Sequence, residues 1–427
     1  MRVRVLPVVI CLAGSLVAVG ASAQPPDVPL RLSLTEAVRL AVERSPSLDA
    51  ARQSAVAAQT DIAAAKRWAN PVARFSSEGY NGDPAGAGFF SQQELVLDLE
   101  QEFDLAGKRG HRAAVATAAA ASAGFSVDDQ ARQLRADVRR AYFQLVLARL
   151  DAELARASLE EIDKVIAVNR SRYQQGEVSG SELRRLEVER LRFSEDAFQA
   201  DLATRNSRTL LLALMGSPRL DLAVEPSDTL QVPPSKAEPG PADAAALVAR
   251  AVAARPDVAA ARKDRERAEA EAALQRALKT PNLSVSGGMR RDFGVNGLAW
   301  GVSMPVPLFD RNAPGIARAD AERRAADSRA RAMELAVSLE VQQALNLVDV
   351  NRQRVQLVER DYLAKAREAR DSVLAAYRAG ESELLDYLDA QRVYRDVQRA
   401  YNRALLDYRL SLFQLDAAAG ANPGDLP

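Results

Sequence analysis

The sequence has few of the residues from which most catalytic and metal sites are built. It contains one histidine, His111, and one cysteine, Cys11, among 427 residues. One histidine is too few for a His-based triad or a His-rich metal site. Gly-x-Ser-x-Gly, His-Glu-x-x-His and phosphate-binding glycine motifs are also missing. We therefore expect no enzymatic activity, no cofactor and no bound metal.

Net charge and aromatic side chains are scarce as well. The 57 basic residues balance 57 acidic ones, and aromatic residues make up 5% of the chain. No overall field attracts nucleic acid, so we expect no nucleic-acid partner. No window after the N-terminal segment has the roughly 18 consecutive apolar residues of a membrane-spanning helix. Abundant alanine favours a mainly helical fold.

The N-terminus has the pattern of a secretory signal peptide. Arg2 and Arg4 precede an apolar stretch, and Ala21-Ser22-Ala23 fits a cleavage site after Ala23. We expect residues 1–23 to be removed. Cys11 lies in this segment, so the mature chain would contain no thiol. Export without a second apolar span leaves the periplasm, the outer membrane or the medium.

Apolar periodicity divides residues 24–216 into a helix, a β-hairpin, a long helix and a shorter helix. A capping box at Ser33–Glu36 begins the first helix, which breaks at Pro46 and continues to about Ala69. Period-two alternation predicts a hairpin at about 71–105. One face of its second strand is acidic and consists of Glu94, Asp98, Glu100, Glu102 and Asp104.

The helical pattern from about Lys108 continues for some 65 residues, to a turn at Gly176. Its apolar residues are spaced four and three apart, which predicts a coiled-coil seam. They are Leu134, Val138, Ala141, Leu145, Ala148, Ala152, Ala155, Leu159 and Ile162. Such a helix is about 100 Å long, more than a compact globule needs. A capping box at Ser179–Glu182 begins the shorter helix.

The chain then repeats this unit. Residues 217–242 form a proline-rich linker, residues 243–420 contain a second hairpin at about 281–308 between equivalent helices, and 421–427 form a tail. The matching pairs are Pro46/Pro256 and Pro71/Pro281 at offset 210, Leu105/Leu308, Leu134/Val337, Val138/Val341 and Ala141/Ala344 at 203, and Tyr173/Tyr377, Gly176/Gly380 and Gly216/Gly420 at 204. Chance does not keep register over so many positions, so the sequence indicates a tandem duplication.

The duplication predicts how the strands are used. Each chain supplies four strands of roughly ten residues, the length of a membrane-spanning β-strand. Four strands cannot close a barrel, and lipid does not tolerate open edges. Three copies give a closed 12-stranded β-barrel, so we expect a homotrimer in outer-membrane lipid, continued by a long periplasmic α-helical coiled-coil barrel. The acidic face would line the pore and favour cations.

Several motifs resemble TolC-like outer-membrane efflux proteins. They are Leu34-Thr-Glu-Ala-Val38, the break at Pro46, Leu105-Ala-Gly-Lys-Arg109, Arg255-Pro-Asp257 and the Tyr-x-x-Gly turns. Pro305-Val-Pro-Leu-Phe-Asp-Arg-Asn312 and Gly107-Lys-Arg109 are most similar to the CzcC-like branch, which serves heavy-metal cation pumps of the resistance-nodulation-division (RND) class. The resemblance implies an outer-membrane exit duct joined to an inner-membrane RND pump through a periplasmic adaptor.

The resemblance also implies a gate at the periplasmic tip, near the turns at Gly176 and Gly380. Its residues would be Tyr377, Asp386 and Asp389, with polar partners Ser181 and Glu182 on the other hairpin. Ser382 stands where the family has a basic residue, and Arg378 could replace that charge. On spacing alone, the two aspartates fit a solvated helix start equally well.

Other functions fit parts of the pattern. The duct could serve drug efflux or type I secretion, or the chain could be a periplasmic coiled-coil adaptor without a barrel. Adaptors usually need one helical hairpin and a β-rich domain, whereas this chain has two membrane-length β-hairpins at matching places. Dependence on detergent would separate a duct from an adaptor.

Overall fold

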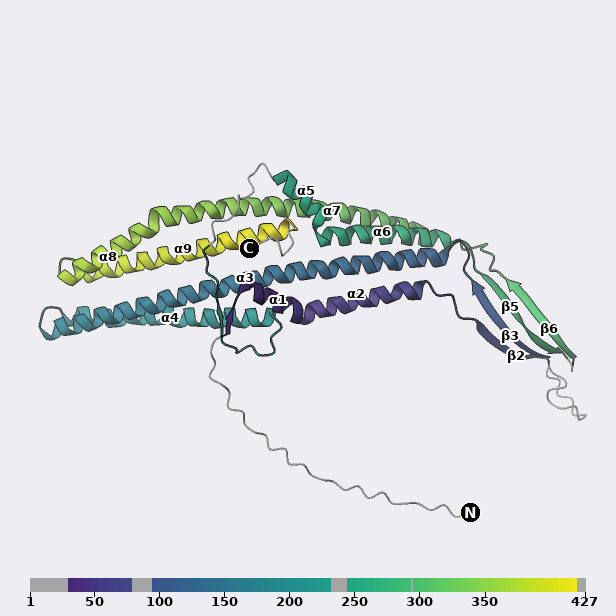
Figure 1. Cartoon of the computed structure of the whole chain (residues 1–427), viewed down its shortest axis with the longest axis horizontal. Helices are drawn as coiled ribbons and strands as arrows, with labels where there is room; N and C mark the ends of the chain where they lie inside the picture. Colours follow the sequence, from purple (N-terminus) through teal and green to yellow (C-terminus); the bar gives the residue numbers. More distant parts are fainter. Residues whose placement is uncertain (1–29, 79–93, 232–243, 293–294, 421–427) are drawn as a thin grey trace, which may run out of the picture.

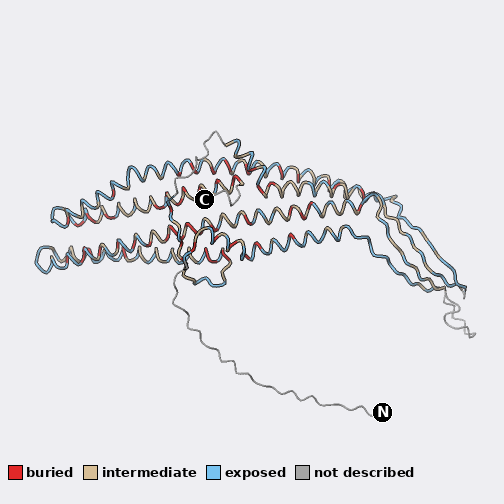
Figure 2. The backbone as a smooth tube through the Cα atoms, viewed as in Figure 1, coloured by how far each residue is buried: buried red, intermediate tan, exposed pale blue. Residues whose placement is uncertain are grey.

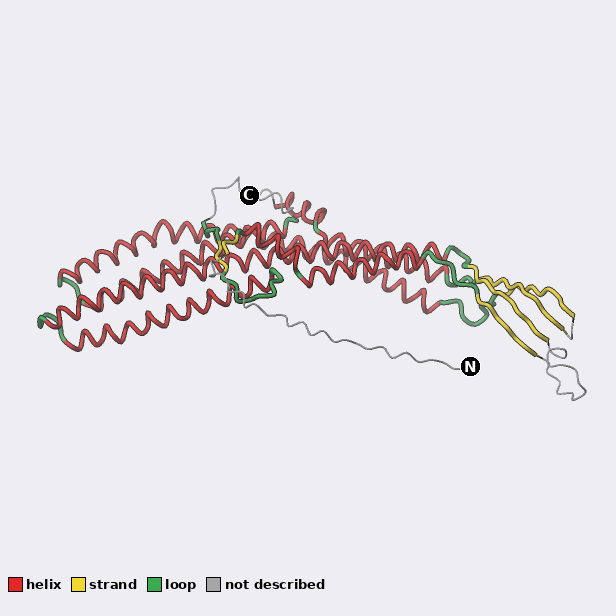
Figure 3. The backbone as a smooth tube through the Cα atoms, turned by 60° about the horizontal axis from the view of Figure 1, so that its bottom comes forward, coloured by secondary structure: helices red, strands yellow, loops and turns green. Residues whose placement is uncertain are grey.

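The computed structural model describes residues 30–78, 94–231, 244–292 and 295–420. The signal peptide expected at 1–23, the turn of the hairpin expected at about 71–105 and the tail at 421–427 lie outside the described residues. The described chain is long and narrow, with helices along most of its length and a sheet at one end (Figures 1 and 3).

The two halves of the chain have the same order of long elements. The first half contains β1 (Leu30–Leu32), α1 (Leu34–Arg44), α2 (Pro46–Ala65), β2 (Val72–Glu78), β3 (Glu94–Phe103), α3 (Lys108–Gln174) and α4 (Gly180–Leu214). The second contains β4 (Val224–Pro226), α5 (Ala244–Ala254), α6 (Pro256–Ala277), β5 (Leu283–Asp292), β6 (Val295–Ser303), α7 (Ala313–Leu357), the π-helix η2 (Val358–Leu363), α8 (Ala364–Ala379) and α9 (Leu384–Ala418).

Local capping explains where several helices begin and end. The Ser33 side chain accepts the Glu36 N–H at the start of α1, and Ser179 accepts the Glu182 N–H at the start of α4. Gly176 and Gly380 adopt φ values of 78° and 80°, which glycine reaches without strain and which end α3 and α8. The first helical run ends at Ala65, not at Ala69 as the sequence suggested.

A clasp near the middle of the molecule was not anticipated from the sequence. β1 pairs in parallel with β4, which lies in the region expected to be an irregular linker. The buried Tyr142 hydroxyl lies 2.8 Å from the Leu32 carbonyl and 2.6 Å from Asp228 Oδ2. It also accepts the backbone N–H groups of Ser227 and Asp228. One tyrosine therefore fastens the first strand and the linker onto α3.

The four longer strands form one antiparallel sheet in the order β2-β3-β5-β6, so β3 and β5 join the two halves. Opposite residues of neighbouring strands lie on the same face. One such row is Phe75, Leu97, Met289 and Leu298, and these side chains are 56–87% exposed. The sheet thus presents one largely apolar face, which is the pattern expected of strands that face lipid.

Coiled-coil packing holds the helices together. Within α3 the predicted seam is buried at all of its positions except Leu134 and Leu159, which are half-buried. Small residues at Ala141, Ala148 and Ala152 allow close approach of the neighbouring helices. Buried residues lie along the helical part, while the residues of the four-stranded sheet are intermediate or exposed (Figure 2).

A π-helix accounts for one change of offset between the halves. Val138 and Val341 match at offset 203, and Tyr173 and Tyr377 match at 204, so the second half has one extra residue between these points. η2 lies between them, and a π-turn is the usual way for a helix to absorb a single inserted residue. α3 runs through the equivalent region as an α-helix. The buried faces before and after the insertion therefore stay aligned.

The strands require another adjustment. Phe75 pairs with Leu97, and Val285 pairs with Val302. If Phe75 is equivalent to Val285 at offset 210, Leu97 is equivalent to Val302 at offset 205. Left-handed residues precede both long helices, Gly107 and Asn312, and these are also 205 apart. The predicted match of Leu105 with Leu308 is therefore wrong. Between the left-handed residue and the first matched residue of the seam, the second half has two fewer residues than the first half.

Candidate functional site

The predicted gate residues gather at the end of the molecule opposite the sheet, where the α3–α4 and α8–α9 turns lie (Figure 1). Tyr377 is 5% exposed, and its hydroxyl donates to Asn169 Oδ1 at 2.9 Å. Glu182 Oε1 lies 3.4 Å from the same hydroxyl. Burial raises the pKa of Tyr377, so the phenol stays protonated and can donate. The structure thus brings Tyr377, Glu182 and Asn169 together.

The two aspartates have partners on their own helix. Asp386 Oδ2 accepts the Glu383 N–H and the Ser382 hydroxyl, both at 3.2 Å, and so caps α9. Asp389 pairs with Arg392 one turn further along. Ser181 Oγ lies 2.8 Å from Ser179 Oγ, at the start of α4. Within one chain, these side chains have the roles of a well-capped helix start.

Charged contacts tie the two helical hairpins together. Arg378 reaches Glu161 on α3 at 3.4 Å, so it bridges the hairpins where Ser382 carries no charge. Arg395 on α9 pairs with Asp196 on α4 at 2.9 Å and stacks on Phe193. Sequence reasoning missed Asn169 and Arg395. Asn169 had a usable signal, since it is a polar residue that continues the spacing of the α3 seam.

A row of buried polar atoms on α9 lacks hydrogen-bond partners among the described residues. They are Tyr387 Oη, Gln391 Oε1 and Arg395 Nε, spaced four residues apart along one helix face. Tyr387 stacks on Tyr377 with ring centroids 5.7 Å apart, and burial raises its pKa to about 12. Unpaired buried polar groups cost free energy. A rearrangement that admits water here would recover part of that cost.

The acidic face of β3 carries more counter-charge than the sequence suggested. Arg74 lies 2.6 Å from Glu100 and 3.9 Å from Asp98, and Arg290 lies 2.6 Å from Glu94. Glu102 accepts a hydrogen bond from Asn282, and Asp104 pairs with Arg112. Each of the five carboxylates on this face of β3 therefore has a polar partner within the chain. Glu78 and Asp292 extend the row, so carboxylates still outnumber guanidinium groups on this face.

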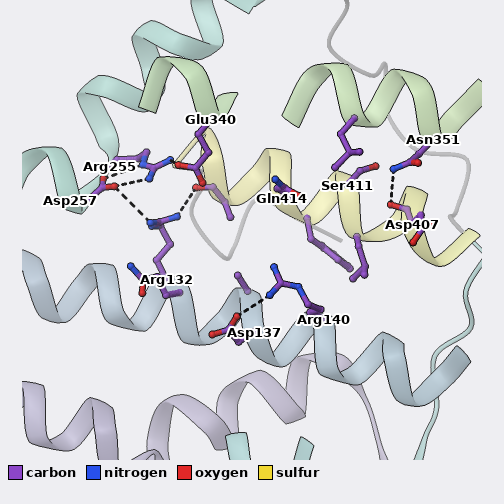
Figure 4. A pocket seen from close by; sticks show the side chains of 16 residues that line it. Arg132, Asp137, Arg140, Arg255, Asp257, Glu340, Asn351, Asp407, Ser411 and Gln414 are labelled. Atoms are coloured by element: carbon purple, nitrogen blue, oxygen red, sulfur yellow. Dashed lines mark hydrogen bonds and ion pairs between the residues drawn. The ribbon is translucent and has the colours of Figure 1, made fainter. Parts of the chain in front are cut away.

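A groove of about 680 Å³ lies between α3, α7 and α9 at the start of α6 (Figure 4). At its end Arg255, 3% exposed, contacts Asp257 and Glu340, each at 2.6 Å, and donates to the Ala418 carbonyl. Arg132 donates to the Ala417 carbonyl. Two cations thus hold the negative end of the α9 dipole. This contact explains the Arg255-Pro-Asp257 motif as a structural joint.

The structure offers little for metal binding. Across the described residues, no group of three or more His, Cys, Asp or Glu side chains is placed to hold a metal ion. The helices in the described ranges also lack a stretch long and apolar enough to cross a membrane.

Comparisons with known proteins cover both halves. Residues 37–217 and 247–421 match the family model of outer membrane efflux proteins. The chain is 26% identical to the cobalt-zinc-cadmium resistance protein CzcC of Cupriavidus metallidurans over 84% of this chain and 83% of that protein. It is 28% identical to the nickel and cobalt resistance protein CnrC of the same species, over 78% of this chain and 76% of that protein. The outer-membrane channel OprN has a similar fold, with a TM-score of 0.76, 20% identity and coverage of 91% of this chain and 90% of that chain.

Proposed function

Because the chain belongs to the outer membrane efflux protein family, we propose that it is the exit duct of a tripartite RND pump for heavy-metal cations. The observation that carries this proposal is the match to metal-resistance relatives across both halves of the chain. The carboxylate-rich face of the sheet agrees with a cationic cargo.

The sheet supports a trimeric duct in the outer membrane. Three copies would supply twelve strands and close a barrel, with the apolar face toward lipid and the carboxylate-rich face toward the lumen. The helices would extend from this barrel as a periplasmic tube, after cleavage of the signal peptide. A periplasmic adaptor and an inner-membrane RND pump would bind at the helical end.

Deletion of the gene tests the cargo. We expect the deletion strain to become more sensitive to zinc, cobalt or cadmium, with drug tolerance unchanged, and the intact gene to restore growth. Unchanged metal tolerance together with hypersensitivity to drugs would reassign the duct to drug efflux.

We place the gate at the tip, where three copies would bring Asp386 and Asp389 into a ring of six carboxylates. Crowded like charges recruit cations. The double substitution Asp386→Asn and Asp389→Asn removes the charge and keeps an acceptor for the Glu383 N–H. In lipid bilayers we expect higher single-channel conductance and about tenfold weaker block by divalent cations, equal to about 1.4 kcal/mol.

The control for this gate is Asp371→Asn, because Asp371 is exposed on α8 and pairs with its neighbour Arg370. Its conductance and its block by divalent cations should match those of the unchanged protein. If the double variant behaves like this control, the two aspartates act only as parts of a helix start.

A further inference from the structure

The contact between the two halves of the chain runs along its whole length. β3 pairs with β5 at the sheet, with Gln101 opposite Val285. At the strand-to-helix junction, Lys108 contacts Asn282, which in turn donates to Glu102. At the tip, Tyr377 contacts Asn169 and Glu182. Because the two halves are repeats, this contact within one chain predicts how the second half of one copy would pack against the first half of another copy.

The free edge of the first half is exposed where the equivalent edge of the second half is buried. Tyr173 is 48% exposed, and its counterpart Tyr377 is 5% exposed. The same comparison holds along α4 and α9. Phe198 and Leu202 are 69% and 51% exposed, and their counterparts at offset 204, Asn402 and Leu406, are 7% and 6% exposed.

Contact with the first half is what buries these counterparts. Leu406 packs in one cluster with Val138 of α3, and Tyr377 bonds to Asn169 of α3. Among the described residues, no strand pairs with the outer edge of β2, and Phe198 and Leu202 of α4 stay exposed. Exposed large apolar side chains at coiled-coil positions indicate a protein contact.

We propose that a second copy of this chain covers this edge with its own β6, the segment 304–308 that follows it, and α7, in the register of the β3–β5 pair. The inference deepens the proposed trimeric duct and rests on it. The counterparts of Gln101 and Val285, at offsets 205 and 210, are Val306 and Phe75. Val306 of one copy therefore lies opposite Phe75 of the next. These side chains are 70% and 68% exposed in a single chain.

This contact gives the Pro305-Val-Pro-Leu-Phe309 motif a role. Within the chain, the junction is held by the polar residues Lys108, Asn282 and Glu102. Their counterparts at the free edges are Ala313, Val72 and Pro307, all of them apolar. Leu308 and Phe309 stand beside them and are 70% and 102% exposed. The junction between copies is therefore apolar where the junction within a copy is polar.

The same register assigns a contact at the tip. Tyr377 contacts Glu182, and at offset 204 their counterparts are Tyr173 and Asp386. Asp386 of one copy thus lies beside Tyr173 of the next, and the Tyr173 hydroxyl can donate to the carboxylate that caps α9.

A cysteine pair tests the register in the full-length protein in its membrane. Gln101 and Val285 are paired strand residues, and the Cα atoms of such pairs lie about 4.5–5.5 Å apart, within disulfide range. The proposed register gives positions 306 and 75 the same spacing. The variant with Val306→Cys and Phe75→Cys should give covalent trimers after oxidation, and reduction should dissolve them. The control pairs Phe75→Cys with Val302→Cys, on the same face about 13 Å further along the strand, and should stay uncrosslinked.

Three outcomes would overturn the proposal. Trimers from the control pair, or channel-forming trimers that resist crosslinking at 306 and 75, would reject the register and leave the duct intact. Absence of both oligomer and channel conductance would reject the duct itself. At the tip, Tyr173→Phe should raise conductance without affecting the crosslink, and an unchanged conductance would remove Tyr173 and Asp386 from the interface.

Discussion

Replacing Arg255 by alanine should lower stability by about 3 kcal/mol, the range seen when one partner of a buried ion pair is removed. The change removes both ion pairs of this side chain and its bond to the Ala418 carbonyl. Asp257 would remain largely buried without its main counter-charge. Thermal loss of the helical circular dichroism signal of the detergent-solubilised protein measures the effect.

The control for Arg255 is Arg262→Ala on the same helix. Arg262 pairs with Glu334 of α7, but both side chains are about 40% exposed. Exposed pairs contribute about 0–1 kcal/mol, so this variant should stay close to the unchanged protein. Equal effects of the two substitutions would show that the joint at Arg255 does not hold the helices together.

The same ion pair gives stability a defined dependence on pH. Burial alone would raise the pKa of Asp257, but hydrogen bonds and charge from Arg255 lower it below its ordinary value. A carboxyl group whose pKa is lowered by folding adds stability above the unfolded value of about 3.9. That contribution is lost as the pH falls from about 4 through the folded pKa. The Arg255→Ala variant should lose less stability over this interval.

Arginine on the apolar face of the sheet should prevent assembly in the membrane. Leu298 lies near the middle of β6 and is 87% exposed, in the row with Leu97 and Met289. If this face meets lipid, Leu298→Arg should cost about 2–4 kcal/mol, as charges near the bilayer midplane do in barrels. Yield in the outer membrane and heat-modifiable migration on gels measure the loss.

Ala299→Arg is the matched control, one residue along the same strand. Its side chain points to the opposite face, in the row with Gly288 and Asp98. If that face lines a water-filled lumen, the variant should assemble normally. Equal assembly of both variants would contradict a lipid-facing sheet and would favour a soluble periplasmic protein.

Periodicity predicted the elements well because each long element repeats one physical rule many times. The α3 seam has apolar residues four and three apart over many turns, and β3 alternates over ten residues. Because of the duplication, each of these patterns occurs twice in the sequence, so each element could be predicted from two independent segments. Helix starts at Ser33 and Ser179 were predictable because the capping residues adjoin the helices that they cap.

Contacts between distant segments left no comparable pattern. The clasp depends on Tyr142 and Asp228, which are 86 residues apart. The acidic face of β3 is visible in the sequence, but Arg74 and Arg290 come from other strands, and only the register places them opposite it. The tip shows the same limit, since Asn169 and Tyr377 are 208 residues apart.

The π-turn in the second half has a consequence for the symmetry of any ring that these chains build. The extra residue changes the local winding of one strut of the second hairpin, whereas the equivalent strut of the first hairpin is α-helical throughout. A tube made from three copies would therefore alternate between two kinds of hairpin. The two sets of three hairpins in such a tube are not equivalent, so one set can shift relative to the other. A single inserted residue thus makes the two hairpins of each chain different, in a tube that would otherwise be close to sixfold symmetric.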